Sequence, residues 1–411
     1  MTIAGQFPRR STLDARRLRF DRNELSGAFG DLGTDLPLIV GMILAARLDP
    51  ASVLIVYGLL QVATGLVYRM PMPVQPLKAV AALVITQRLP AATLYGGGLA
   101  IGLTMLLLSV TGLLGRLARL VPKVVVRGIQ AGLGLQLAGL ALRDYVPSAG
   151  PAGWALAAAA FAVTLALLGN RRLPPAPFVV LLGVLFALAT SADAWRLWDG
   201  FGVALPTLRA PTWADVTTGF VLLALPQIPL SLGNSVLATR QMATDLFPER
   251  PPLSVRRIGL TYSAMNLVSP FLGGVPTCHG SGGMAGHYAF GARTGGSVVL
   301  YGLFWLGLGL FFSAGFATVV AIFPKPVLGV LLLVEALALL VLLRDLVGDG
   351  GSRLSALGSR PPQAVAESRE PGAESGQLWL ALLVALIASM VPYGYLVGMV
   401  VGTALAAVRK Q

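Results

Sequence analysis

Long apolar runs recur along this chain between residues 27 and 408, and they constrain the fold more than any other feature. Of the 411 residues, 55% are hydrophobic and 12% are charged, whereas soluble domains carry roughly 25% charged residues. Runs of about 20 apolar residues match the thickness of a bilayer. Because lipid offers the backbone no hydrogen-bond partners, such runs must be helical. The sequence therefore predicts an all-α polytopic membrane protein.

Fourteen membrane segments can be placed, several of them short or interrupted. They cover residues 25–46, 50–68, 70–87, 94–114, 122–142, 152–169, 176–192, 216–239, 257–272, 273–291, 297–316, 324–344, 377–392 and 394–408. Residues 1–24 are polar and arginine-rich, without a cleavable apolar leader, and predict a cytosolic tail or an interfacial segment that binds anionic lipid. Residues 193–215 predict an interfacial connection, and residues 345–376 a disordered loop.

The lysines and arginines support this topology. With the N-terminus inside, 23 of the 31 lie on the inside, six lie outside, and Lys78 and Arg127 fall within segments. Such a bias is typical of cytoplasmic loops, so the net charge of +13 does not indicate nucleic-acid binding. We expect a bacterial-type inner or plasma membrane, with both termini in the cytoplasm and the lipid bilayer as the surroundings. A homodimer is left open.

The chain contains an internal repeat. Five short matches recur in order at offsets of 200 to 206 residues, including residues 32–34 with 232–234 and residues 94–96 with 300–302. Each half then holds seven segments, residues 25–192 and residues 216–408. Because seven is odd, the second half is inverted relative to the first. Inverted repeats with interrupted helices are typical of secondary transporters that bind their substrate near the bilayer midplane.

Residues 71–82 interrupt the apolar pattern of the first half. This stretch holds three prolines, Gln75 and Lys78, and a continuous helix cannot hold prolines at that spacing. We expect extended backbone up to Gln75 and a helix that starts near Pro76, where the missing N–H is not needed. The free N–H groups of the helix start and the charge of Lys78 together predict an anion site.

Residues 273–283 form the matching break in the second half. They contain Pro276 and a glycine-rich run, and the next helix should begin near His279 or Gly280. The two extended-then-helical elements should meet in mid-membrane with their helix N-termini facing each other. Glycines at 280, 282 and 283 would let backbone N–H groups approach a small oxyanion closely. Helix packing through small residues is the alternative, but it would not require Pro276 and His279 beside them.

The segments beside these breaks carry polar groups that need partners. Asp31 and Asp35 lie in the first segment, and one of them is expected to balance Lys78. Gln227 and Asn234 in the eighth segment are candidates for direct contact with the anion or for hydrogen bonds between helices.

Three groups are candidates for proton coupling: Asp31, His279 and Glu335. For each there is a structural alternative, namely a fixed ion pair or cap, a satisfied buried histidine, and a buried helix–helix hydrogen bond. One cysteine and two histidines offer no metal-ligand set, and no catalytic motif is present, so we expect no cofactor, no metal and no enzyme activity.

Five motifs resemble those of a known family. They occupy residues 30–34, 72–78, 229–235, 245–248 and 276–283, the last continuing through residues 290–295. On these motifs the chain resembles the molybdate transporter family, a branch of the sulfate permease-like superfamily, over residues 25–345. Leu77 stands where that family usually has methionine. Sulfate permeases usually carry a soluble C-terminal regulatory domain, which is expected to be absent here.

The resemblance implies a seven-plus-seven inverted-repeat fold like that of uracil permeases. Segments 1–4 and 8–11 would form a core that moves against a gate of segments 5–7 and 12–14. The expected function is import of molybdate, a tetrahedral oxyanion, by alternating access, with proton coupling as a further hypothesis. The expected substrate-binding residues are Thr34, Gln75, Pro76, Leu77, Lys78, Gln227, Asn234, Ser235, Cys278, His279, Gly280, Ser281 and Gly282. Sulfate transport or an anion channel on the same scaffold are the alternatives.

Overall fold

The computed structural model describes residues 17–120, 122–168, 170, 173, 175–191, 200–346, 371–391 and 394–408, and it is mainly helical. The first half comprises α1 (Arg22–Ala28), α2 (Leu32–Ala46), α3 (Pro50–Tyr68), β1 (Val74–Pro76), α4 (Lys78–Gln87), α5 (Ala91–Val110), α6 (Leu113–Leu120), α7 (Lys123–Leu140), η2 (Ala141–Tyr145), η3 (Val146–Ala149), α8 (Gly150–Leu167) and α9 (Pro175–Thr190). The second half comprises α10 (Trp213–Gly219), η5 (Phe220–Ala224), α11 (Leu225–Leu230), η6 (Ser231–Ala238), α12 (Thr239–Leu246), α13 (Val255–Val268), η7 (Ser269–Leu272), β2 (Thr277–His279), α14 (Ser281–Ala289), α15 (Gly296–Ile322), α16 (Lys325–Val341), η8 (Leu342–Leu346), α17 (Pro371–Met390) and α18 (Gly394–Val408).

Six helices in the described part of the chain are long and apolar enough to cross a membrane. The number becomes seven if α1 and α2, which meet at a bend of 40°, form one span. Shorter apolar helices include α4 and α9. Each of the fourteen segments placed from sequence overlaps a helix, but the count of fourteen crossings stays a prediction.

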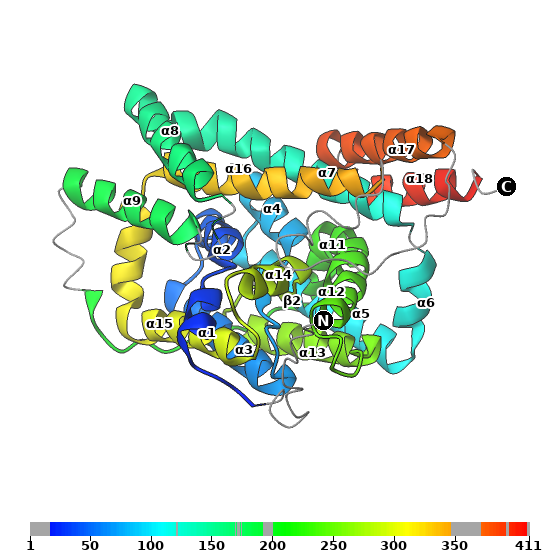
Figure 1. Ribbon diagram of the computed structural model, residues 1–411, viewed down its shortest axis with the longest axis horizontal. Helices are drawn as coiled ribbons and strands as arrows, with labels where there is room; N and C mark the ends of the chain where they lie inside the picture. Colours follow the sequence, from blue (N-terminus) through cyan, green and yellow to red (C-terminus); the bar gives the residue numbers. More distant parts are fainter. Residues whose placement is uncertain are drawn as a thin grey trace, which may run out of the picture.

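The helices divide into a flat layer and a broader body (Figure 1). Helices α7, α8, α16, α17 and α18 run along one edge of the molecule, where α7 packs against α16 and α17. The body contains the remaining long helices, with α4, α14 and the two strands near its centre. The short sheet therefore lies inside the body, and not in the layer.

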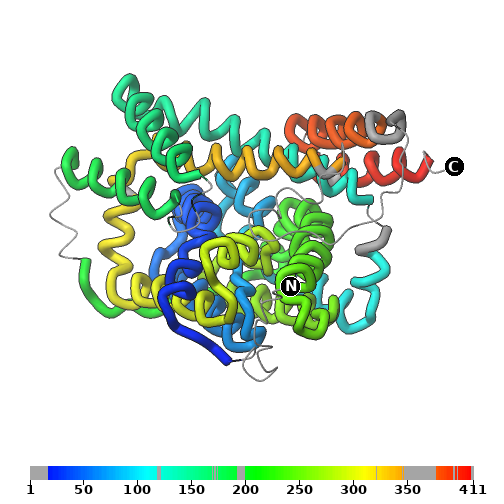
Figure 2. Tube along the Cα trace, viewed as in Figure 1, coloured from blue at the N-terminus to red at the C-terminus, as the bar shows by residue number. Residues whose placement is uncertain are grey.

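Segments from the two halves of the chain interleave within the body (Figure 2). The clearest case is the packing of α3 along α15. At Gly58 and Gly302 a Cβ atom on either residue would come within 2.7 Å of the other's carbonyl oxygen, so glycine on both sides is what allows this close approach. Tyr57 packs edge-on against Trp305 beside this contact, with ring centroids 5.6 Å apart.

The two interrupted elements pair with each other as antiparallel strands. In the register, Val74 lies opposite His279, Gln75 opposite Cys278, and the third pair is Pro76 with Thr277. Helices α4 and α14 therefore leave the ladder from its opposite ends. This confirms the two predicted breaks.

Helix α4 starts two residues later than the sequence suggested. Pro76 was expected in the first helical turn, but it is the last residue of β1, and the helix begins at Lys78. The reason is the pairing: the N–H of Leu77 donates to the carbonyl of Pro276 at 3.0 Å, which extends the strand geometry past Pro76. The second break agrees closely, because α14 begins at Ser281.

The start of the chain is attached to the body through Glu24. From sequence this residue belongs to the polar tail, but it lies in α1 with an exposed fraction of 1%. Its carboxylate accepts hydrogen bonds from the backbone N–H groups of Arg293 and Thr294 at 2.9 Å and Ser297 at 3.1 Å. A carboxylate at the start of α15 neutralises the free N–H groups there.

The segment that connects the two halves is hydrogen-bonded to α15 at a kink in that helix. Phe312 has a non-helical backbone conformation, and the carbonyls of Leu310 and Phe311 accept hydrogen bonds from Ala204 at 2.9 Å and Gly202 at 3.1 Å. The predicted tail up to residue 16, the connection at residues 192–199 and most of the predicted loop, residues 347–370, lie outside the described residues.

Candidate anion-binding site

The two-stranded ladder sorts its side chains onto two faces. Successive residues of a strand point to opposite faces, so Gln75 and Cys278 share one face, while Val74 and His279 share the other. The first face carries a group of polar residues from five elements, α2, β1, α4, β2 and α16, which we call the central polar cluster. It consists of Asp31, Thr34, Gln75, Lys78, Cys278 and Glu335.

Within this cluster Gln75 holds the carboxylate of Asp31. Its side-chain amide donates to both oxygens of Asp31, at 2.7 and 2.8 Å. Asp31 also lies against the first turn of α14, because a Cβ at Gly283 would overlap its Oδ2. The negative carboxylate therefore occupies a position that favours it, near the positive end of α14.

Lys78 forms an ion pair with Glu335 of α16. Thr34 donates its hydroxyl to the second oxygen of Glu335 at 3.1 Å. The prediction that Asp31 or Asp35 forms the ion pair with Lys78 is therefore wrong, because the partner is Glu335. Asp35 is fully buried and accepts a hydrogen bond from the Tyr301 hydroxyl at 3.0 Å. The counter-charge comes from the opposite half because α16 packs beside α2.

Helix α4 has its N-terminus capped by Gln227. The Oε1 atom of Gln227 accepts hydrogen bonds from the backbone N–H groups of Ala79 at 3.0 Å and Val80 at 3.3 Å. With Leu77 bonded to Pro276, several N–H groups that were expected to bind an anion already have acceptors. In this structure α4 offers the ammonium group of Lys78, and Gln227 acts as a cap.

Helix α14 presents a more open N-terminus. Ser281 donates its hydroxyl to Oδ1 of Asn234 at 3.1 Å, so the two residues lie together at the helix start. Gly282 is exposed, and a Cβ added there would meet no heavy atom within 4 Å. The first N–H groups of a helix have no partner within that helix. The N-terminus of α14 can therefore donate hydrogen bonds to an anion that enters the space beside Gly282.

The other two glycines of this run serve packing. A Cβ at Gly280 would overlap the side-chain amide of Gln75, and one at Gly283 would overlap Asp31 and come within 2.7 Å of Pro73. The close approach inferred from the glycine run is thus present. At Gly280 and Gly283 it is made to protein atoms, and Gly282 alone of the three faces open space.

The imidazole of His279 points away from the central polar cluster. Its Nε2 atom lies 2.7 Å from the Thr261 hydroxyl, and its ring packs edge-on against Tyr68 at 5.2 Å between centroids. Strand periodicity explains this, since His279 and Cys278 are neighbours and must face opposite ways. On the cluster side, the Cys278 side chain is buried, with an exposed fraction of 3%.

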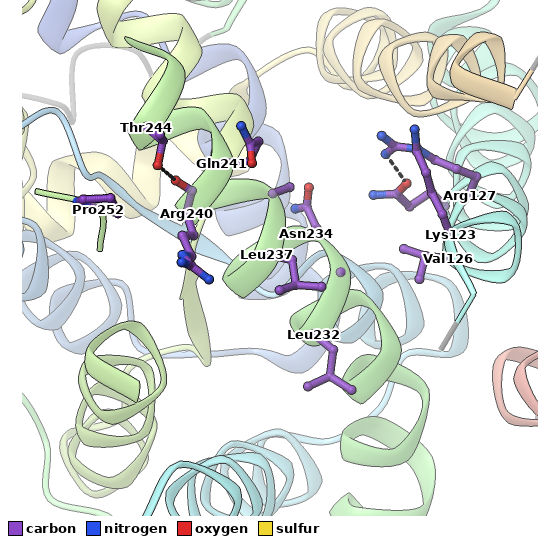
Figure 3. Close-up of a pocket in the computed structure, with 13 residues that line it drawn as sticks. Lys123, Val126, Arg127, Leu232, Asn234, Leu237, Arg240, Gln241, Thr244 and Pro252 are labelled. Atoms are coloured by element: carbon purple, nitrogen blue, oxygen red, sulfur yellow. Dashed lines mark hydrogen bonds between the residues drawn. The ribbon is translucent and has the colours of Figure 1, made fainter. Parts of the chain in front are cut away.

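A cavity of about 620 Å³ opens between α7 and the η6–α12 segment (Figure 3). Lys123 and Arg127 lie on one wall, Arg240 on the other, and Asn234 lies along it. No acidic side chain is among the described residues that line the cavity. We call this cavity the basic vestibule. From sequence, Lys123 and Arg240 were placed on the inside and Arg127 within a segment, and their convergence was not predicted.

Comparison with protein families identifies the family of this chain. Residues 23–137 and 219–339 match the family model described as "Molybdate transporter of MFS superfamily", which is more than half of the chain. The chain belongs to the molybdate transporter family. The matched stretches contain both strands, both interrupted helices and every residue of the central polar cluster.

Curated relatives agree with this assignment. Molybdate transporter 2 of Arabidopsis thaliana is 34% identical over 381 residues, which cover 80% of this chain and 81% of the relative. Molybdate transporter 1 of Chlamydomonas reinhardtii is 29% identical over 445 residues, covering 78% and 84%. This family member is therefore a membrane anion transporter and not an enzyme.

Solved structures show the fold. The transmembrane domain of a cyanobacterium bicarbonate transporter, BicA, matches with a TM-score of 0.58 at 16% identity, covering 90% of this chain and 97% of that one. SLC26A9 matches with a TM-score of 0.65 at 13% identity, covering 94% and 64%. The predicted sulfate permease-like fold is thus confirmed.

Proposed function

We propose that this transporter imports molybdate by alternating access. The proposal rests on one observation: a cation and an open helix N-terminus lie beside the same two-stranded ladder. Lys78 supplies the charge from α4, and the start of α14 supplies N–H groups beside Gly282. A small oxyanion bound there would interact with both halves of the chain. The family membership makes molybdate the first substrate to test.

The oxyanion would lie among Thr34, Lys78, Asn234, Ser281 and the backbone at Gly282. These residues offer hydroxyl, ammonium, amide and N–H donors, which suit the oxygens of a dianion. Gln75 and Gln227 would position these donors, since each makes a hydrogen bond to a neighbouring group. Ser235 and Cys278, which are both buried, would pack beside them. Pro76 and Leu77 would contribute by setting the start of α4, and His279 and Gly280 by pairing β2 with β1.

The transport cycle would move a core of segments 1–4 and 8–11 against a gate of segments 5–7 and 12–14, as a seven-plus-seven inverted repeat. The separation of α7, α8 and α16–α18 as a layer supports this division. So does the antiparallel pairing of one strand from each half. With the termini in the cytoplasm, as the positive-inside bias suggests, the basic vestibule would be the inward path of the anion.

Proton coupling is part of the proposal. Of the three candidates, Asp31 and Glu335 lie in the central polar cluster, while the His279 side chain lies on the other face of the ladder. The carboxylates are therefore the better candidates. Uptake into proteoliposomes that does not respond to an imposed proton gradient would count against coupling.

The second candidate function is transport of sulfate or another small anion. It is favoured by the fold shared with a bicarbonate transporter and with SLC26A9. An anion channel on the same scaffold would differ in rate, and electrical recording would detect currents far above the turnover of a carrier.

Uptake of radiolabelled molybdate into proteoliposomes tests the proposal. We expect uptake at low molybdate concentration that survives a large excess of sulfate. Loss of uptake in the presence of sulfate would instead support a general sulfate-type permease. Absence of uptake under every gradient, from protein that is folded, would contradict the proposal.

A further inference from the structure

Glu335 occupies a position unlike that of the other acidic residues in the cluster. It is the only acidic residue of α16, within the apolar run at residues 330–343, and 5% of its side chain is exposed. One oxygen pairs with Lys78 of α4 and the other accepts the Thr34 hydroxyl of α2. The contact therefore ties α16 to two elements of the body.

The groups that hold Glu335 are also groups suited to an oxyanion. A carboxylate and a tetrahedral oxyanion both present oxygens that accept hydrogen bonds from an ammonium and a hydroxyl. A buried ammonium without a counter-charge is strongly unfavourable, so Lys78 needs an acceptor when no substrate is bound. Glu335 provides that acceptor in this structure.

Resting on the proposed function, we infer that Glu335 is an internal substitute for the substrate, which displaces it from Lys78 and Thr34. When the dianion binds, Glu335 loses its counter-ion and takes up one proton from water on its carboxylate. When the dianion leaves, Glu335 releases that proton and pairs with Lys78 again. Binding of the anion and binding of a proton are thereby coupled at one residue.

Charge balance supports the protonation step. Electrostatic interaction with Glu335 comes from Lys78 and, with the opposite sign, from Asp31. On the neighbouring elements, Arg127 of α7 donates to Gln130, and Tyr145 of η2 packs near Gly329, six residues before Glu335. Once the dianion holds Lys78, Glu335 would lie between two negative groups in a region of low dielectric, which favours its neutral form.

Displacement of Glu335 would also promote the conformational change of the transport cycle. While Glu335 holds Lys78 and Thr34, α16 is linked to α2 and α4. Substrate binding would break this link and free the layer that contains α16 to move relative to the body. A ligand shifts a conformational equilibrium through such a difference in contacts.

Molybdate binding to the purified protein by calorimetry tests this inference, using the unmodified protein, Glu335→Gln, Lys78→Met and the double variant at about pH 6 and about pH 8. The unmodified protein should bind more tightly at the lower pH, where protonation of Glu335 is favoured. Glu335→Gln should bind about tenfold more tightly at the higher pH and lose the pH dependence. In the Lys78→Met background, Glu335→Gln should restore the folding stability lost with the unpaired carboxylate. It should not change the remaining affinity for molybdate, because Glu335 acts on the anion through Lys78.

Glu249→Gln is the matched control, since it removes the same charge from a side chain that is 54% exposed. Weaker binding by Glu335→Gln, or a pH dependence equal to that of the unmodified protein, would overturn the inference. So would an effect that persists without Lys78. If Glu335→Gln does not fold, Glu335→Asp keeps the charge but shortens its reach and should bind more tightly, and unchanged affinity would refute the competition.

Failure of the proposed function has a different signature. An unmodified protein that binds sulfate but not molybdate would contradict the proposed substrate, and the same four proteins would then be compared with sulfate. An unmodified protein that binds neither oxyanion would contradict both ideas.

Discussion

Gln75 and Asp31 form a two-point contact at the centre of the molecule, with the side-chain amide 2.7 and 2.8 Å from the two carboxylate oxygens. Both residues are buried. The contact joins β1 to α2 and leaves the carboxylate against the first turn of α14. The side-chain amide of Gln75 thus helps to fix the relative positions of β1, α2 and α14, which are distant in sequence.

Replacing Gln75 with alanine should destabilise the protein. It leaves a buried carboxylate without its donor, which costs about 1–3 kcal/mol in the free energy of unfolding. Thermal unfolding in detergent would measure the loss. Gln241→Ala is the matched control for stability, because Gln241 makes a comparable contact with Asp245 at 2.7 Å on an exposed part of α12. Equal stability of the two variants would contradict a structural role for the Gln75–Asp31 contact.

Replacing Lys78 with alanine should abolish molybdate uptake. The change removes the cation of the candidate site and leaves Glu335 buried without its partner, a situation that costs about 3–5 kcal/mol in related cases. Uptake should therefore be compared at matched amounts of folded protein. Restored folding with unchanged uptake in Lys78→Ala/Glu335→Gln would remove Lys78 from the transport site.

Replacing Gln227 with alanine should reduce both stability and uptake. The variant loses the cap of α4, and lost caps cost about 0.5–2 kcal/mol. Thr212→Ala is a suitable comparison, because Thr212 caps the exposed start of α10. We expect both variants to unfold at lower temperature and only Gln227→Ala to lose uptake. Normal uptake by Gln227→Ala would show that α4 does not need this cap for transport.

Substitutions at Gly280 and Gly282 should distinguish a glycine needed for packing from one needed for access of the anion. Gly282→Leu should fold normally and block uptake, since its side chain would fill the open space at the start of α14. Gly280→Leu should fail to fold, since its side chain would overlap Gln75. Melting curves and uptake assays together distinguish these outcomes. Normal uptake by Gly282→Leu would place the substrate elsewhere.

Neutralising the basic vestibule should affect transport from one side of the membrane. In Lys123→Gln/Arg240→Gln, molybdate flux that starts on the vestibule side should fall by about tenfold at low salt, because focused positive charge raises the local anion concentration. Flux from the other side should change less. Arg256→Gln, which removes an exposed charge from the first turn of α13, is the control. Equal loss from both sides would contradict a role in anion entry or exit.

The sequence by itself determined the features that depend on local chemistry. Apolar runs placed the helices, because a backbone in lipid must satisfy its own hydrogen bonds. Prolines at 71, 73, 76 and 276 placed the two breaks, because proline cannot continue a helix. Lys78 was identified as the central cation since a charge in an apolar segment is costly and needs a purpose.

The tertiary structure alone decided the partners of these groups. Glu335 lies 257 residues from Lys78, and Gln227 lies 148 residues from the Ala79 N–H that it caps, so neither contact has a local signal. The direction of the His279 side chain followed from the strand register, which depends on how the two halves pair. Which charges neutralise one another in an apolar interior is set by which helices meet, and that is a property of the packed fold.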